Sequence, residues 1–202
     1  MDQELERHQI KDSVKREKRL SKPRIPPFEG EWHKLISQEY ISFKKVYDDN
    51  IINIFKTIAR YPKLMKNWYP FFVHIVRSSR LPKRDSELII LRIGWLCQSE
   101  YEWSRHVTSA KEIGFSDEEI IRITKGPKAE GWNEFERTLL HAVDELYFDA
   151  FISDETWKIL SEKYNEQKLM DLIFTVGEYN LVSMFLNTIG VQLEEGDKGF
   201  PE

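Results

Sequence analysis

The chain has 202 residues, of which 41% are hydrophobic and 32% charged, so it is long enough for one well-filled core of a soluble protein. Its net charge of -4 and pI near 5.8 exclude a general nucleic-acid binder. No apolar run approaches the roughly 18 residues of a membrane span, and no secretory signal peptide is expected. The single cysteine, Cys97, excludes a disulfide within the chain and favours a cytoplasmic location.

The first 24 residues are predicted to form a charged arm outside the core, because they are poor in large apolar side chains. Basic residues cluster in it: Lys15, Arg16, Lys18, Arg19, Lys22 and Arg24. Prolines at 23, 26 and 27 then favour an extended chain. We therefore divide the sequence into this arm (1–24), a single all-α domain (25–196) and a short tail (197–202).

Helical segments are predicted between the arm and residue 76, because apolar residues recur there at spacings of three and four. They cover residues 32–47, 51–58 and 64–76. Pro62 is expected to break the chain, and Pro70 is expected to bend or split the last of these helices.

A hairpin of two helices over residues 82–113 is the predicted centre of the fold. Its first half is apolar on nearly every side, as in a helix buried in the middle of a domain, and Pro82 suits its first turn. Ser99 and Glu102 have the spacing of a capping box, which predicts that the second helix begins after Ser99. Gly114 supplies the C-terminal stop.

Four more helices are predicted after the hairpin. A capping box from Ser116 to Glu119 opens a short helix that ends at Gly126, and an amphipathic helix follows over 135–147. Ser153 or Asp154 caps the next one. The last helix, roughly 167–186, is apolar on most faces and should pack beside the central one. With no alternating strand pattern, the predicted fold class is all-α, a bundle of eight or nine helices.

Ionisable residues gather where the two helices of the hairpin meet, and such groups are costly in a core unless they are paired. Glu102 and His106 are four residues apart and share one helix face. Glu87 lies on the preceding helix and can meet His106 in a tight hairpin, shielded by Trp95 and Trp103. A carboxylate and an imidazole in a partly dry pocket form a proton relay tuned toward neutrality.

Each of these residues also has a structural interpretation that the sequence leaves open. Glu102 can serve only as the capping-box residue. Glu87 can pair with Arg84 or with Arg92. A lone histidine is more often a structural hydrogen-bonding group than a catalyst. A metal site made of Glu87, Glu102 and His106 is a weak signal at these spacings, and none is predicted.

The hairpin also resembles a known family. The motifs are LPxRxxELxILR, beginning at Leu81, and YEWxxH, which ends at His106. They are similar to the carboxymuconolactone decarboxylase family, which shares the AhpD-like, or alkylhydroperoxidase-like, all-helical fold. The likeness is strongest from Leu81 to Gly114 and continues more loosely to Asn187–Val191, whereas residues 1 to about 50 carry no motif of the family.

The alkylhydroperoxidase branch of that family carries a glutamate followed by Cys-x-x-Cys-x-x-x-His. Aligned on His106, the glutamate falls on Glu87, but Ser99 and Glu102 occupy the two cysteine positions, and Cys97 is two places out of register. The redox thiol pair is therefore absent, and dithiol peroxidase activity is not expected. The resemblance is to a branch without the pair, in which Cys97 is expected to be a buried packing thiol.

The resemblance implies a lyase that needs no cofactor and acts on a small carboxylated lactone or a related acid. Loss of carbon dioxide leaves an enolate, which must be stabilised and then protonated. The catalytic residues implied are His106 as proton donor, Glu87 as its orienting carboxylate and Glu102 as a second acid or base. Substrate binding is assigned to Arg92, Arg105, Tyr101, Trp103 and Ser99.

Two other classes of function stay open from the sequence. One is a different proton-transfer enzyme that uses the same pair of residues, Glu87 and His106. Such a protein could also belong to the peroxidase family by descent and lack its redox thiols. The other class is a helical oligomer that only binds a ligand. A pocket of a few hundred cubic ångströms that reaches His106 would favour an enzyme, whereas reactive groups sealed from solvent would favour the non-enzyme. The many aromatic residues and the family resemblance predict a homo-oligomer (trimer, hexamer or dimer), with no nucleic-acid or membrane partner.

Overall fold

The computed structural model describes residues 20–31 and 51–201, which contain eight α-helices, one π-helical turn and no strand. The all-α prediction is confirmed. The predicted helix over residues 32–47 and most of the basic arm lie outside the described residues. The elements are α4 (Asn53–Ile58), α5 (Pro62–Val73), the π turn η1 (His74–Ser78), α6 (Lys83–Leu96), α7 (Glu100–Glu112), α8 (Asp117–Lys125), α9 (Glu134–Asp149), α10 (Asp154–Lys163) and α11 (Glu166–Ile189).

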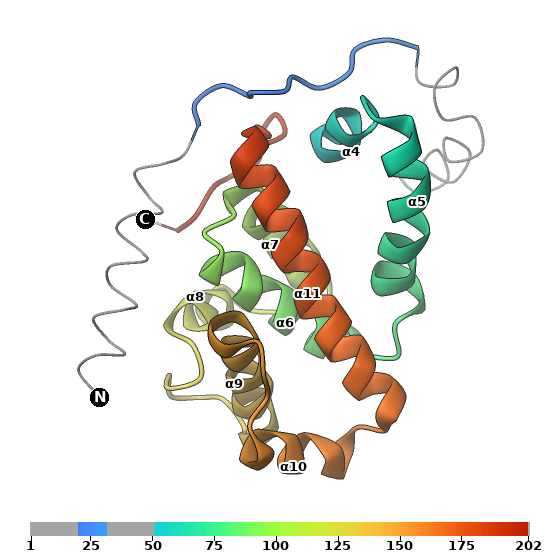
Figure 1. Cartoon of the computed structure of the whole chain (residues 1–202). Coiled ribbons are helices and arrows are strands. Elements are labelled where there is room, and N and C mark those ends of the chain that lie inside the picture. Colours follow the sequence, from blue (N-terminus) through green and yellow to red (C-terminus); the bar gives the residue numbers. More distant parts are fainter. Residues whose placement is uncertain (1–19, 32–50, 202) are drawn as a thin grey trace.

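The central helix α6 packs against α7, α8, α9 and α11 (Figure 1). It is buried along its whole middle, because apolar residues occupy nearly every position: Leu88, Ile89, Ile90, Leu91, Ile93 and Leu96. The chain turns from α6 into α7 at Cys97 and Gln98, and Gln98 has a positive φ of 52°. The predicted hairpin over residues 82–113 is therefore confirmed to within a residue or two at each end.

The starts of the helices show which of the predicted capping motifs form. The capping box from Ser116 to Glu119 is present, and the Ser153 side chain accepts from the backbone N–H of Thr156. At the start of α7, however, Ser99 is the N-cap residue but makes no side-chain cap hydrogen bond. The predicted capping box from Ser99 to Glu102 is therefore wrong. The Glu102 side chain is turned toward His106 instead.

Of the two prolines of α5, Pro62 lies where the expected break occurs, because α4 ends at Ile58 and a new helix begins at Pro62, whose missing N–H costs nothing in a first turn. Pro70 lies within α5 and neither ends nor splits it. The helix continues to Val73 and widens into the π turn η1, which places His74 Nε2 3.1 Å from the Asp171 carboxylate on α11.

The described segments before α4 and after α11 lie close to the end of α11 and to the hairpin. The backbone N–H of Arg24 donates to the carbonyl of Ile189 at 2.7 Å, so the segment before α4 runs past the C-terminal end of α11 (Figure 1). Near the C-terminus, Phe200 packs against Trp95 and Trp103 at ring-centroid distances of 5.1 and 5.7 Å. This part of the predicted tail is therefore anchored on the hairpin.

Helix α11 crosses the near side of the fold in Figure 1. At 24 residues and a mean hydropathy of 1.3 in its most apolar window, it has the length and composition of a membrane span, contrary to the expectation from the sequence. Just over half of that window, 56%, is buried inside the fold, and the central helix of a soluble protein meets the same criteria. The remainder of the window faces outward.

Candidate acid–base site

His106 and Glu87 meet where α6 and α7 pack together. His106 Nδ1 lies 2.8 Å from Glu87 Oε2, and both side chains are about 15% exposed. The alternative partners proposed for Glu87 are engaged elsewhere. Arg84 pairs with Glu119 and Glu136, and Arg92 pairs with Asp144. The predicted contact between Glu87 and His106 is therefore present.

Glu102 faces the other side of the imidazole. Its Oε2 lies 3.5 Å from His106 Nε2, which is an ion-pair distance at the outer edge of hydrogen bonding. The ring of Tyr179 on α11 packs edge-on against His106 at 4.9 Å. Trp95 and Trp103, predicted to shield the pair, pack instead against each other, at a ring-centroid distance of 5.4 Å. The aromatic residue on His106 is therefore one that the sequence did not indicate.

Burial and charge set the protonation of this group. The pKa of Glu102 is raised above its usual value because burial disfavours the carboxylate, although His106 opposes the shift. Burial lowers the pKa of His106, but the carboxylates of Glu87 and Glu102 raise it more, and the net direction is upward. The site thus favours an imidazolium held between two carboxyl groups, one of which readily keeps its proton.

A third carboxyl group belongs to this environment, and sequence reasoning missed it. Glu178 on α11 is 4% exposed, and Trp68 on α5 donates its indole N–H to Glu178 Oε1 at 2.6 Å. Burial raises the pKa of Glu178, and the charge of Glu178 in turn raises the pKa of Glu102. The signal in the sequence was a glutamate within a mostly apolar helix, but spacing alone gave it no partner.

The two arginines assigned to substrate binding lie in different surroundings. Arg92 is 5% exposed and donates two hydrogen bonds to Asp144, at 2.6 and 2.8 Å, and others to the carbonyls of Ile123 and Thr124. It therefore ties α6 to α8 and α9, and the structure does not bring it to His106. Arg105 Nη1 lies 3.6 Å from Asp197 Oδ2, and its charge lowers the pKa of both Glu102 and His106.

The remaining predicted substrate contacts are buried in the packing. The Tyr101 hydroxyl donates to Glu194 Oε1 at 2.5 Å, within the cluster around α4 and α5. Trp103 is 2% exposed in the main core. Ser99 is fully buried, and its hydroxyl has no hydrogen-bond partner among the described residues. Of the five residues assigned to substrate binding, Arg105 is the one whose charge acts on the site.

A cavity of about 520 Å³ lies at the turn of the hairpin and the end of α11. Its walls include Cys97, Tyr101, Asn180 and Met184, but not His106 or Glu87. Cys97 is 7% exposed, and its thiol donates to Asn180 Oδ1 at 3.1 Å. The thiol is buried, as predicted. The cavity does not provide the approach to His106 that would favour an enzyme.

The donor set around His106 does not suit a metal ion. Each ring nitrogen faces a carboxylate oxygen, so the imidazole separates Glu87 from Glu102. In the described ranges, no group of three His, Cys, Asp or Glu side chains has the arrangement to hold a metal. The group can instead move protons, because Glu87 orients the ring through Nδ1 and leaves Nε2 as the nitrogen available for exchange.

Comparison with known proteins agrees with the motifs in the hairpin. A family model described as "Carboxymuconolactone decarboxylase family" matches residues 62–145. That range runs from the start of α5 into α9 and contains Glu87, Glu102 and His106. No curated protein sequence matches the chain.

Solved structures with the same fold include proteins of different chemistry. An uncharacterised peroxidase-related protein from Ralstonia eutropha, described as an alkylhydroperoxidase AhpD core, is 16% identical, with 85% of this chain and 93% of that chain covered and a TM-score of 0.73. A peroxidase-related protein from Silicibacter sp. is 14% identical over 87% and 95%, with a TM-score of 0.72. A debrominase in complex with 2,3,4-tribromopyrrole is 15% identical over 86% and 93%, with a TM-score of 0.70.

At such identities the likeness to these structures establishes the fold and not the activity. The resemblance read from the hairpin motifs is confirmed by the family match and by the fold together. Residues 62–145 therefore match the carboxymuconolactone decarboxylase family, on an AhpD-like fold and in a chain that lacks the Cys-x-x-Cys pair.

Proposed function

We propose that the chain is a cofactor-free proton-transfer enzyme, a carboxy-lyase acting on a small carboxylated lactone or a related acid. The observation that supports this is the His106 ring held between Glu87 at 2.8 Å and Glu102 at 3.5 Å in a largely buried setting. A general acid must lie near the proton acceptor with a pKa near the working pH, and this environment raises the pKa of both Glu102 and His106 above their usual values.

In the reaction, the bond between the substrate carboxylate and its α-carbon breaks, and carbon dioxide leaves. The bonding electron pair stays on the substrate as an enolate. His106 Nε2–H gives a proton to the α-carbon and becomes a neutral imidazole, still oriented by Glu87 through Nδ1. Glu102, whose raised pKa keeps a proton available, reprotonates Nε2, and solvent restores the proton to Glu102.

The enolate must be stabilised while it exists, and the imidazolium provides a positive charge at the reacting carbon. Arg105 adds a second positive charge near Glu102 and His106, and is the substrate-carboxylate partner in this proposal. Entry of substrate widens the 3.5 Å gap between Nε2 and Glu102, since contacts in a site without substrate are commonly long and rearrange on binding.

The test is a screen of the purified full chain against carboxylated lactones and their ring-opened acids, followed by ultraviolet absorbance and by release of carbon dioxide. The His106→Gln variant should lose roughly a hundredfold or more in turnover, because glutamine cannot exchange a proton near neutral pH. His141→Gln, at an exposed histidine of α9, is the matched control and should keep full activity. Equal turnover in the two variants would rule out His106 as the proton donor.

A further inference from the structure

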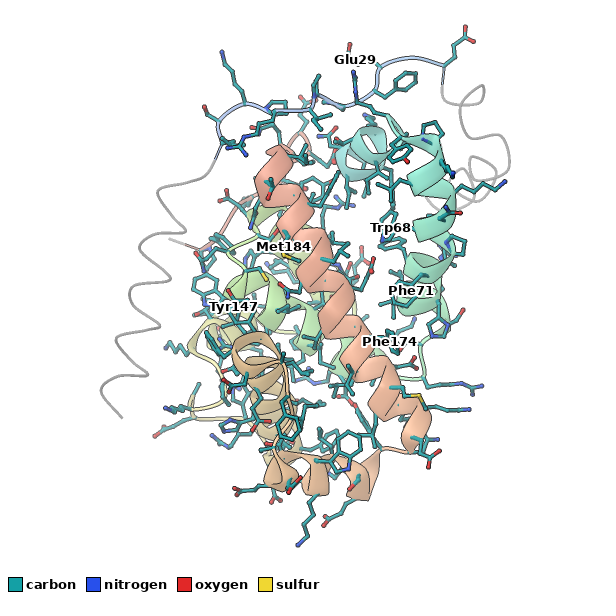
Figure 2. The ribbon with its side chains drawn as sticks, viewed as in Figure 1. Glu29, Trp68, Phe71, Tyr147, Phe174 and Met184 are labelled. Atoms are coloured by element: carbon teal, nitrogen blue, oxygen red, sulfur yellow. The ribbon has the colours of Figure 1, made fainter. Side chains whose placement is uncertain are left out.

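The outward face of α11 carries a stripe of exposed apolar residues. Between residues 170 and 184 every exposed position is uncharged, and five of them are large: Met170 (52% exposed), Ile173 (40%), Phe174 (53%), Leu181 (51%) and Met184 (56%). Phe71 of α5 extends the stripe, with its ring 5.8 Å from that of Phe174. Figure 2 shows this pair on neighbouring helices, with Met184 farther along α11.

Gly177 lies at the centre of this stripe, which we call the α11 stripe. A Cβ atom placed on it would meet nothing within 4 Å, so the backbone there is open to a neighbour. Counting outward from Gly177, the large residues are placed symmetrically: Met170 and Met184 are each seven residues away, and Ile173 and Leu181 are each four. A stripe with this symmetry is complementary to a second copy of itself running in the opposite direction.

The size of the stripe is also that of a specific interface. Large side chains that are about half exposed leave on the order of 80 Å² each, so the stripe and Phe71 present roughly 500 Å² of apolar surface. That is as large as the biggest apolar patch usual on a monomer. Two copies would together bury about 1,000 Å² before any polar rim is counted, which reaches the lower limit of the area that a biological interface buries.

We propose that the α11 stripe is the contact surface between two copies of this chain, related by a two-fold axis that passes near Gly177. The two α11 helices cross in an antiparallel manner. Met170 then packs against Met184 of the partner subunit, and Ile173 and its neighbour Phe174 pack against Leu181 of the partner subunit. A two-fold contact of this kind uses the same patch on both copies, as the symmetric spacing requires.

The ends of the stripe fit this arrangement better than they fit a membrane surface. Beyond the apolar section, its neighbours on α11 are Glu166, Gln167 and the half-buried Lys168 at one end and Asn187 and Thr188 at the other. Helices that lie on membranes are instead rich in Lys and Arg beside the apolar face. In the antiparallel pair, the end with Glu166 and Lys168 meets the uncharged end of the other helix, so no like charges oppose each other.

The proposed contact also lies behind the acid–base site. Gly177 precedes Glu178 and Tyr179, which turn inward from the same part of α11. Trp68, the partner of Glu178, lies one turn before Phe71 on α5. A second copy on the stripe therefore covers the outer side of the helix turns that hold these groups. The contact does not depend on the proposed reaction, since it follows from exposure and symmetry alone.

The experiment is sedimentation velocity of the full chain, with two charged variants of the stripe. The wild-type chain should sediment at micromolar concentration as twice the 24.2 kDa protomer mass, or as an even multiple of it. Phe174→Glu and Leu181→Lys should each remain folded, because both positions are about half exposed, and each should dissociate. Mixing the two variants should restore the dimer, since Glu at 174 then faces Lys at 181 of the partner subunit.

Phe151→Glu is the matched control, because Phe151 is 65% exposed but lies outside α11, and it should keep the wild-type mass. A monomeric wild-type chain would overturn the proposal, whether the stripe is then covered by other residues of the same chain or binds vesicles of anionic phospholipid in co-sedimentation. Charged variants that keep the wild-type mass would overturn it too. Variants that dissociate but do not associate on mixing would exclude the antiparallel arrangement.

Discussion

Helices α9 and α11 both pack on the central helix α6, yet they bury different kinds of side chain. The buried face of α9 is apolar apart from Thr138, whose hydroxyl donates to the carbonyl of Glu134 at 2.8 Å. The buried face of α11 includes Asp171, Thr175, Glu178 and Ser183 among its apolar residues. Its exposed face carries methionine, phenylalanine and leucine. On α11, polar residues are thus buried among apolar ones, and large apolar residues are exposed.

The pattern of buried and exposed side chains has a different cause in each helix. The pattern of α9 follows from the core of one protomer, because burial of apolar area stabilises it and water solvates the rest. The pattern of α11 does not, since a buried carboxylate costs stability and an exposed phenylalanine adds none. The proposed site on the inner face and the proposed second subunit on the outer face would account for both departures.

The largest expected effect is a loss of stability. The experiment compares the removal of one leucine side chain from each helix. Leu139→Ala on α9 removes a fully buried side chain and should lower the free energy of unfolding by about 2–5 kcal/mol. Leu181→Ala on α11 should change it by less than about 0.5 kcal/mol. Both are measured by denaturant unfolding in a Phe174→Glu background, where association does not contribute. Equal losses would mean that Leu181 is part of the protomer core.

The next effect concerns the acid–base site and the way its members act together. Glu87→Gln should lower turnover about tenfold, because an amide still orients the ring of His106 but no longer favours its charged form. Combined with His106→Gln, it should add little to the histidine change alone, as in residues that act as one unit. The measurement is a double-mutant cycle on turnover, and losses that simply multiply would show that the pair does not act together.

The inner face of α11 also predicts a pH dependence of stability. The pKa of Glu178 is raised by burial, so the folded state keeps a proton that the unfolded state releases at lower pH. Stability from this group therefore falls as pH rises from the unfolded pKa through the folded one. Glu178→Gln keeps an acceptor for Trp68 and removes the charge. It should raise the free energy of unfolding near neutral pH and flatten the profile.

The control for that measurement is Glu162→Gln, an exposed glutamate of α10, which should leave the profile of stability against pH unchanged. A Glu178→Gln protein that is less stable than wild type near neutral pH would mean that the charged carboxylate is itself well paired in the fold. The polar inner face of α11 would then need no functional explanation at this position.

The smallest effect is expected at Cys97, which contacts α11 through Asn180. Cys97→Ser keeps a donor to the Asn180 side chain and nearly the same volume, so turnover of any substrate found should stay within about twofold of wild type. Peroxide consumption by the wild-type chain that disappears in this variant would instead assign the thiol a redox role.

The sequence alone determined the elements that depend on local patterns. Apolar periodicity located the hairpin over 82–113 to within a residue or two, and the Ser116 and Ser153 caps formed as their spacing predicts. Glu87 and His106 could be paired in advance because they lie on consecutive helices of one tight hairpin. Short separation along the chain leaves few ways for two such side chains to be arranged.

Tertiary structure decided what periodicity does not encode. Ser99 and Glu102 have the spacing of a cap, but Glu102 faces His106 because the packing of α6 against α7 buries it there. Glu178 meets Trp68 across 110 residues, and no local signal joins positions so far apart. Since α11 is apolar on most sides, its sequence did not indicate which face turns inward. Contacts with α6 and η1 made that choice, leaving Met170, Phe174 and Met184 exposed.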